Sequence, residues 1–278
     1  MKKISRRSFM AAAAVSVAAL ALTACGGSAS SAASSVASSA ASSEAVSSAA
    51  AADLTTVEAG KLTMATNATF PPYEMTTDSG EIEGIDVDTA KAIAEKLGLE
   101  LQIDDMEFDA ALLSVQQGKA DIVMAGVTVT DERKAVMDFS DSYATGIQSI
   151  IVPNDSEIAS PDDLAGKKIG TQRGTTGYIY CSDDFGEDSV VAYDSGLTAV
   201  QALNNGQVDA VVIDNAPATE YVAANPGLKV LDTSYAEEDY AIGMAKGSAL
   251  EDAVNKALEE LKADGTLQAI VDKYINAN

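Results

Sequence analysis

The chain has 278 residues, 47% of them hydrophobic, which is enough for one large domain or two ordinary ones. It carries 42 acidic against 18 basic residues, and this net charge of −24 disfavours nucleic acid and anionic lipid surfaces as partners. Histidine is absent, which excludes Ser-His and Cys-His activation of a nucleophile and the usual zinc ligand sets.

The N-terminus has the layout of an export signal. Four basic residues within the first seven positions precede an apolar run from 10 to 22, and small residues follow up to Cys25. This order is typical of a secretory signal peptide, which is removed. Cys25, followed by two glycines, resembles the lipobox of bacterial lipoproteins, in which the cysteine is acylated and becomes the new N-terminus. We therefore predict a signal peptide at 1–24 and a lipidated Cys25, with an incidental cysteine near an ordinary cleavage site as the alternative.

The segment after the predicted cleavage site is expected to be a flexible tether. Residues 25–54 are mostly serine and alanine and cannot bury a core. Random-coil scaling gives about 30 such residues a reach of roughly 30 Å. The pair of arginines in "SRRSF" is also typical of twin-arginine signals, so the export route stays open. Cys181 would then be the one remaining thiol, which predicts a packed small side chain and no disulfide within the chain.

From Lys61 onward, short apolar runs alternate with segments of helical periodicity. Strands that alternate with helices favour an α/β architecture with mainly parallel sheets. The elements predicted up to residue 125 are strands at 61–66, 99–103 and 121–125 and helices at 87–98 and 109–117. Two more helices are predicted at 248–275, where apolar stripes lie on either side of Gly265.

Two phrases of this body are repeated. "VQQGKADIVMAG" (115–126) and "LNNGQVDAVVID" (203–214) both read as a helix end, a glycine, two residues, an aspartate and an apolar strand. "GKLTMAT" (60–66) and "GKKIGTQ" (166–172) form a second pair. Repeated strand–helix units favour two similar lobes, each with its own sheet, although any two α/β segments look somewhat alike.

Candidate site residues follow from the ends of the repeated strands. Ligands of open α/β sheets bind beyond the carboxyl ends of strands, and in the repeat these ends are Gly126 and Asp214. Thr128 and Thr130 follow Gly126, and Thr130 is expected to cap a short helix that holds Arg133. Its guanidinium could grip a carboxylate as a bidentate partner, or it could balance neighbouring acidic residues on a solvated surface. Asp214 either caps the next helix or meets a cation.

A glycine- and threonine-rich loop is the third candidate. "GTQRGTTG" (170–177) ends a strand and precedes a helical segment, and such turns direct backbone N–H groups at an anion. It is neither a Walker A loop nor G-x-G-x-x-G, and many turns of this kind are only turns. One arginine, one anion-directed loop and one carboxylate together complement a zwitterion, of which an α-amino acid is the simplest example.

At these residues the chain resembles the bacterial extracellular solute-binding proteins of family 3, the receptors of polar amino-acid ABC transporters. The resemblance runs from Lys61 to Tyr274 and implies a periplasmic-binding-protein-like (type II) α/β fold, with the ligand in a cleft between two lobes joined by two hinge strands. Lobe 1 would comprise 55–143 with 241–278, and lobe 2 would comprise 147–237. The segments that carry it are "ATNATFPPYE" (65–74), "EGIDVDTAKAIAEKLG" (83–98), residues 106–143, "GTQRGTTG" and "VDAVVIDNAPA" (208–218).

The resemblance also implies roles for individual residues. Arg133 would clamp the α-carboxylate of the ligand, with backbone N–H groups of Thr128 and Thr176. Asp214 would take the α-ammonium, with the carbonyl of Gly126 and the hydroxyl of Thr128. The remaining predicted contacts are the aromatic walls Phe70 and Phe108, and Asn67, Tyr73, Glu74, Ala125, Gln172 and Thr175.

The side chain of the ligand is less well defined. Asn67 stands where several receptors for cationic or amide ligands have an aspartate, which argues against lysine or arginine without excluding them. Glu74 could supply the missing negative charge. The family pattern therefore favours a polar L-amino acid and does not select one.

The resemblance implies an extracytoplasmic receptor without cofactor, metal or catalytic residues. It would be a monomer, lipid-anchored at the outer face of the cell membrane, and would deliver its amino acid to separate permease and ATPase subunits of an ABC transporter. One alternative is an enzyme that resembles cyclohexadienyl or arogenate dehydratases, with Glu74 as the general acid. Another is an amino-acid-sensing lipoprotein.

Overall fold

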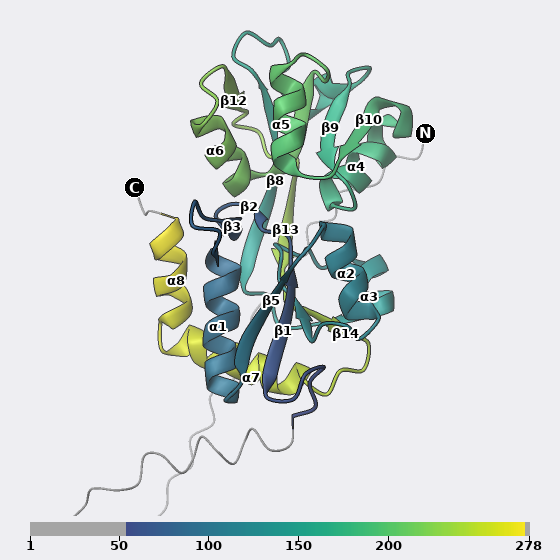
Figure 1. Ribbon diagram of the computed structural model, residues 1–278. Helices are drawn as coiled ribbons and strands as arrows, with labels where there is room; N and C mark the ends of the chain where they lie inside the picture. The colour runs from purple at the N-terminus through teal and green to yellow at the C-terminus, as the bar shows by residue number, and fades with distance from the viewer. Residues whose placement is uncertain (1–53, 276–278) are drawn as a thin grey trace, which may run out of the picture. The chain divides into compact units, whose positions relative to one another are not determined.

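The computed structural model describes residues 54–275. The predicted signal peptide, the lipidated Cys25 and the tether up to residue 53 lie outside the described residues. The described chain contains two mixed sheets and a smaller three-stranded one (Figure 1). No helix in this part of the chain is long and apolar enough to cross a membrane.

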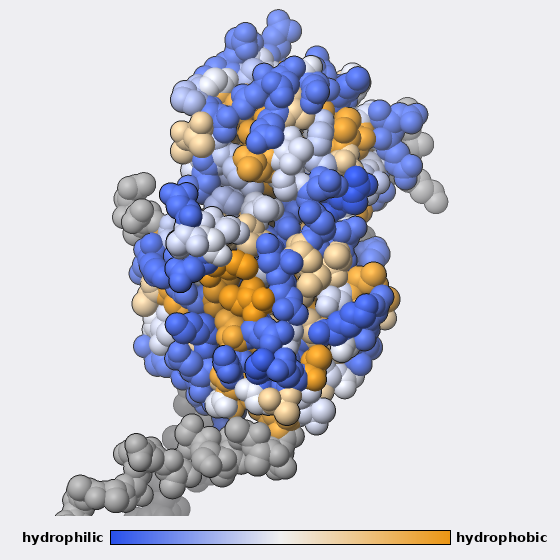
Figure 2. Space-filling view, in the orientation of Figure 1, coloured by the Kyte–Doolittle hydropathy of each residue, from blue (hydrophilic) through white to orange (hydrophobic). Residues whose placement is uncertain are grey.

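The first sheet has the strand order β5-β1-β6-β14-β7. One side of it is parallel, because β1 pairs in parallel with both β5 and β6, whereas β14 joins β6 and β7 in antiparallel fashion. Its strands are β1 (Lys61–Thr66), β5 (Glu100–Asp105), β6 (Ile122–Val123), β7 (Met137–Phe139) and β14 (Gly243–Ala245). The surface in Figure 2 is mainly hydrophilic, with apolar side chains gathered over α1 and the edge strand β5.

The second sheet has the order β10-β9-β11-β8-β12, and β13 also pairs with β8. It repeats the parallel side, since β9 is parallel to β10 and β11, while β8 runs antiparallel to its three neighbours. The prediction of mainly parallel sheets therefore holds only for one side of each sheet. The strands are β8 (Ala144–Pro153), β9 (Ile169–Gln172), β10 (Val190–Tyr193), β11 (Ala210–Asp214), β12 (Leu228–Val230) and β13 (Ala236–Tyr240).

The helices associate with the sheet to which their neighbouring strands belong. In Figure 1, α1, α7 and α8 lie together beside the first sheet, and these three helices contact one another. The helices are α1 (Ile85–Leu97), α2 (Phe108–Gln116), α3 (Asp131–Val136), α4 (Thr176–Phe185), α5 (Gly196–Asn204), α6 (Asn215–Ala223), α7 (Glu251–Ala263) and α8 (Thr266–Tyr274), with 3₁₀ turns at Pro161–Leu164 and Glu187–Ser189. The small sheet consists of β2 (Thr69–Phe70), β3 (Glu74–Thr76) and β4 (Ile82–Glu83).

The repeat predicted from the sequence is present in the structure. The helix α2 leads to Gly118 and then to β6, and α5 leads to Gly206 and then to β11. Both glycines have a positive φ, 65° and 67° respectively, so the two copies also share their backbone turn. One copy lies in each of the two large sheets, as the two-lobe hypothesis requires.

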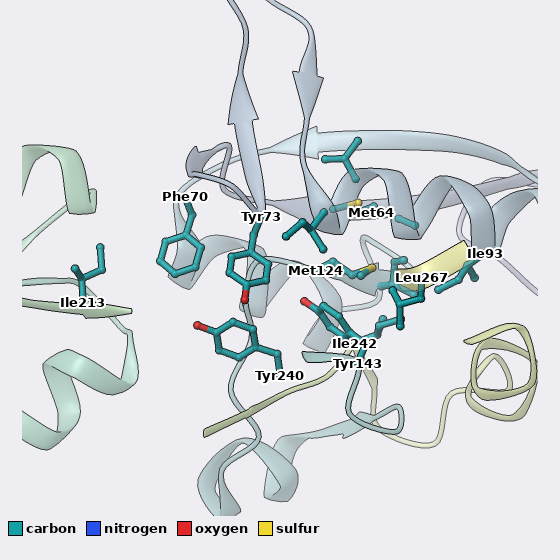
Figure 3. Packing of buried hydrophobic residues seen from close by; sticks show 14 of the residues in the cluster. Met64, Phe70, Tyr73, Ile93, Met124, Tyr143, Ile213, Tyr240, Ile242 and Leu267 are labelled. Carbon is teal, nitrogen blue, oxygen red and sulfur yellow. The ribbon is translucent and has the colours of Figure 1, made fainter. Parts of the chain in front are cut away.

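The strands β8 and β13 of the second sheet run side by side and extend from it toward the first sheet (Figure 1). Near them, the ring of Tyr73 lies between Phe70 and Tyr240 (Figure 3), stacked on the first at 5.9 Å and edge-on to the second at 5.3 Å. Tyr240 is fully buried in the main apolar cluster. Cys181, as predicted, is a free, buried side chain within an apolar cluster of the second sheet.

Gly84, at the start of α1, leads to a first prediction on stability. Its φ is 143°, and a Cβ there would clash with the carbonyl oxygen of Tyr73. Because both the backbone conformation and this rigid neighbour disfavour a side chain, Gly84→Ala is expected to destabilise the protein by about 2–4 kcal/mol. Gly80→Ala is the matched control, since its φ of 84° is also positive but a Cβ would meet nothing within 4 Å. Equal losses of Tm in the two variants would contradict the predicted clash.

Candidate ligand-binding site

All but one of the site residues predicted from the sequence line a single small cavity. Most of them are buried, and they come from both large sheets and from the small one. Tyr73 is the predicted residue that does not line it, because its ring lies behind Phe70 and borders a second pocket together with Tyr240. The cavity is lined by Asn67, Phe70, Glu74, Phe108, Ala125, Gly126, Thr128, Arg133, Gln172, Thr175, Thr176 and Asp214.

Arg133 is held in the cavity wall by the capped helix α3. Thr130 forms the N-cap, and its hydroxyl accepts a hydrogen bond from the backbone N–H of Arg133 at 3.2 Å. The guanidinium donates from Nη1 to the carbonyl of Thr128 at 2.7 Å and from Nη2 to the carbonyl of Gly174 at 3.2 Å. Burial lowers the pKa of Arg133, and the side chain is only 8% exposed. The alternative of a solvated surface arginine is therefore wrong.

The loop before α4 presents a helix N-terminus to the same cavity. Thr175 is the N-cap, accepts from the N–H of Tyr178 at 3.4 Å and donates to the carbonyl of Gln172 at 2.8 Å. Thr176 is the first helical residue and is buried. The N–H groups of a first helical turn have no acceptor within their own helix, so this end favours an anion.

Asp214 lies at the end of β11 and begins α6, but its side chain makes no capping hydrogen bond. Instead Oδ1 accepts from the hydroxyl of Tyr240, and Oδ2 accepts from Nε2 of Gln148 at 2.8 Å. Burial raises the pKa of Asp214 to about 7. A cation in the cavity would restore the ionised form, which fits the cation-binding alternative rather than the helix cap.

Two phenylalanines form apolar walls. The ring of Phe108 lies beneath the guanidinium of Arg133, with 5.4 Å between the Cζ atom and the ring centroid. Phe70 packs against Gly126 so closely that a Cβ on this glycine would lie 2.8 Å from the Phe70 ring. Gly126 therefore lets the aromatic wall approach the strand end.

Glu74 contributes a second carboxyl group to the cavity lining. It is fully buried, and no hydrogen-bond donor among the described residues reaches its side-chain oxygens, whose neighbour within hydrogen-bonding reach is the carboxyl group of Asp86. Burial and the nearby carboxyl group of Asp86 hold the pKa of Glu74 well above its usual range. Asp86 itself accepts from the N–H of Gly126 at 2.9 Å and from the hydroxyl of Tyr143 at 2.7 Å, while burial raises its pKa to about 6.

Hydrogen bonds also join residues 67–69 to Gln172 on β9 and Tyr221 on α6. Nε2 of Gln172 donates to Oδ1 of Asn67 at 2.9 Å, and the same oxygen accepts from the hydroxyl of Thr69 at 2.9 Å. The hydroxyl of Tyr221 donates to the carbonyl of Thr69. The amide of Asn67 is thus engaged in protein contacts. Among residues 54–275, no group of three or more Asp, Glu or Cys side chains is arranged to hold a metal ion.

The sequence matches the family model of the bacterial extracellular solute-binding proteins, family 3, over residues 62–277. The chain belongs to this family. The L-cystine-binding protein TcyJ of Escherichia coli K12 is 33% identical over 225 residues, which cover 80% of this chain and 85% of TcyJ. The structure also resembles the arginine-, lysine-, histidine-binding protein ArtJ of Geobacillus stearothermophilus, with a TM-score of 0.75 and 35% identity over 78% of this chain and 96% of ArtJ. An ancestral arginine-binding protein bound to arginine has a TM-score of 0.74 and 43% identity, over 78% and 99% of the respective chains.

Family membership decides two points that the sequence left open. The two-lobed, periplasmic-binding-protein-like (type II) fold is confirmed, because these solved structures cover most of the chain at high similarity. Members of the family bind solutes outside the cytoplasm and are not enzymes, so the chain is a solute receptor rather than a dehydratase-like enzyme.

Three residues behind the cavity were not predicted. Gln148 and Glu238 are buried, and Tyr240 is completely so. Gln148 donates to both Asp214 and Glu238, at 2.8 and 3.0 Å. No motif marks these positions, because their burial arises from the pairing of β8 with β13, in which Glu238 lies opposite Gly146.

Proposed function

We propose that this chain is an extracytoplasmic receptor that binds a polar L-amino acid between its two lobes and delivers it to the permease of an ABC transporter. The observation that supports this proposal is that Arg133 and Asp214 line one cavity. An α-amino acid has a carboxylate and an ammonium on adjacent carbons. One buried cation and one buried carboxyl group in a small cavity complement both charges.

The roles of individual residues follow from their chemistry. The guanidinium of Arg133 would bind the α-carboxylate, with the N–H groups of Thr128 and Thr176 as further donors. Asp214 would bind the α-ammonium, with the Gly126 carbonyl and the Thr128 hydroxyl as further acceptors. Because these groups come from both large sheets, the ligand would favour the closed arrangement of the lobes, here taken as 55–143 with 241–278 and 147–237.

We further propose that the ligand is a cationic amino acid, with L-arginine as the reference compound. Arg133 is the one buried cationic side chain among residues 54–275, whereas Glu74, Asp86, Asp214 and Glu238 are all buried acidic side chains at or behind the cavity. Such an excess of buried carboxyl groups favours a ligand that brings net positive charge. Glu74 is the candidate partner for that charge, because it is fully buried in the cavity lining and its neighbour Asp86 is a second carboxyl group rather than a cation.

The relatives agree with this choice in part. ArtJ is an arginine-, lysine-, histidine-binding protein, and the ancestral protein was solved with arginine, whereas TcyJ binds L-cystine. The absence of an aspartate at position 67 argued against a cationic ligand. That argument is weaker once Asn67 is seen to bond Gln172 and Thr69, because position 67 then serves contacts within the protein.

The N-terminal proposals rest on the sequence. Residues 1–24 would be a lipoprotein signal peptide, and the monomeric receptor would be anchored to the outer face of the cell membrane through lipidated Cys25. Residues 25–54 would then be a tether, on which the receptor can reach its permease.

A thermal-shift screen of the purified body, residues 54–278, against the twenty L-amino acids and cystine tests the proposal. A ligand that binds only the folded state raises the Tm in proportion to the logarithm of its concentration over Kd. L-Arginine is expected to give the largest shift, L-lysine a smaller one, and the matched control D-arginine little or none. No shift with any amino acid would refute the amino-acid receptor. A largest shift with a neutral amino acid would refute only the cationic side chain.

A further inference from the structure

Glu238 gathers three hydrogen bonds on one oxygen directly behind the cavity. Its Oε2 accepts from the hydroxyl of Thr176 at 3.0 Å, from the hydroxyl of Thr128 at 3.2 Å and from Nε2 of Gln148 at 3.0 Å. The side chain is buried and does not itself line the cavity. Its other oxygen accepts no hydrogen bond of ordinary geometry among the described residues, although the hydroxyl of Tyr180 lies close enough to Glu238 for this carboxyl group to raise the pKa of Tyr180. All three donors therefore converge on a single carboxylate oxygen.

This arrangement fixes the polarity of the two threonine hydroxyls. A carboxylate can only accept, so each threonine directs its one hydroxyl hydrogen at Glu238 and keeps only lone pairs for other partners. Nε2 of Gln148 also lies 3.4 Å from the hydroxyl oxygen of Thr176, farther than from its two carboxylate acceptors. Thr128 lines the cavity, so a hydroxyl whose hydrogen is directed at Glu238 can offer only acceptor lone pairs to a ligand there. An ammonium group, which has donors only, complements such a hydroxyl.

The same network reaches the carboxyl group of Asp214. Nε2 of Gln148 donates at once to Oδ2 of Asp214 and Oε2 of Glu238, and Tyr240 holds the other oxygen of Asp214. Glu238 and Tyr240 are both on β13, two residues apart. One strand thus orients both acceptors, the Asp214 carboxylate and the Thr128 hydroxyl.

We propose that Glu238 is a positioning residue for the α-ammonium of the ligand: its carboxylate holds the Thr128 hydroxyl as a hydrogen-bond acceptor toward the cavity. The inference rests on the proposed amino-acid site. Glu238 then determines how strongly the receptor prefers an amino acid to the same molecule without its amino group. A side chain without an acceptor at this position frees the hydroxyl to rotate and to donate into the cavity, where it opposes an ammonium.

Calorimetric titration of Glu238→Met with L-arginine and with its des-amino analogue, 5-guanidinopentanoic acid, tests this role. Methionine keeps the length of the side chain and removes the acceptor. L-Arginine is expected to bind at least about tenfold more weakly, and the analogue less than about threefold more weakly. Glu238→Gln, which retains one acceptor oxygen, is expected to keep L-arginine affinity within about threefold. An equal loss for both compounds in Glu238→Met would overturn the proposal.

A double-mutant cycle with Thr128→Val separates positioning from a merely structural effect. Once the hydroxyl is gone, Glu238→Met is expected to cost little further L-arginine affinity, whereas additive losses would contradict the inference. If Glu238→Met does not fold, Glu238→Asp takes its place, since it keeps the charge but withdraws the carboxylate by one methylene, and the same selective loss is expected. A wild-type protein that binds no amino acid refutes the proposed function itself. A binding wild type with unselective variants refutes only the role of Glu238.

Discussion

Arg133→Ala is expected to weaken L-arginine binding by roughly 100- to 1,000-fold or more, while the Tm of the unliganded protein changes by only a few degrees. The guanidinium is buried over Phe108 and donates to two backbone carbonyls, and within the described residues Glu238 and Asp214 act on its charge without a direct ion pair. Its desolvation, which lowers its pKa, offsets much of what those two hydrogen bonds contribute to stability. A ligand carboxylate supplies the direct counter-charge, so removing the guanidinium mainly lowers the affinity for the ligand and changes the stability of the unliganded protein little. Calorimetry and thermal melts measure the two quantities.

Arg173 provides the matched control for this variant. Its side chain is 55% exposed, borders the rim of the cleft beside Phe108, and pairs loosely with Asp194 at 3.6 Å. Arg173→Ala is expected to leave affinity within about threefold, because an exposed ion pair is worth little. Arg133→Lys should fall between the two, since lysine keeps the charge but cannot form a bidentate pair. Comparable affinity in the two alanine variants would remove Arg133 from the site.

Periodicity and repetition predicted the fold because both patterns arise from interactions between residues that are close in the sequence. The helix α1 has its apolar residues on one buried face and ends at Gly98, which adopts the left-handed conformation. The internal repeat went further, since it pointed to Gly126 and Asp214 as facing positions, and both line the cavity. Strand ends were less certain: the strand predicted at 121–125 is regular only over Ile122–Val123.

Whether a single charged side chain is buried could not be predicted from its neighbours in the sequence. Arg133 lies among acidic residues that suggest a solvated helix face, yet its own side chain is buried while Asp131 and Glu132 are exposed. Glu238 lies in "AEEDY", which also reads as solvated, and is buried because β13 pairs with β8. Burial of Arg133 depends on its contact with Gly174, about 40 residues away in the sequence. Burial of Glu238 depends on its contact with Gln148, about 90 residues away.

Asp214→Asn is expected to weaken L-arginine binding by roughly 100-fold, and binding of 5-guanidinopentanoic acid by less than about threefold. The carboxylate is the charged acceptor available to an α-ammonium at that end of the cavity, and the des-amino analogue has no ammonium to lose. The analogue also reports distortion, because asparagine replaces one of the two oxygens that hold Tyr240 and Gln148. Equal weakening of both compounds would refute the ammonium role.

The pH dependence of the same variant gives a second, independent measure. Burial raises the folded-state pKa of Asp214 from 3.8 to about 7. Between about pH 4 and 7, its carboxyl group is therefore protonated in the unliganded folded protein and ionised in the unfolded chain. The contribution of Asp214 to unliganded stability therefore falls as pH rises through that window. An α-ammonium favours the ionised form, so below pH 7 binding must release this proton, and affinity should rise with pH until about 7 and then level off. Asp86, with a pKa of about 6, and Glu74 add to the dependence of affinity on pH.

Titrations at pH 6 in buffers of different ionisation enthalpy measure the number of protons released on binding. Asp214→Asn is expected to release close to one proton fewer than wild type, and unchanged release would contradict the assignment.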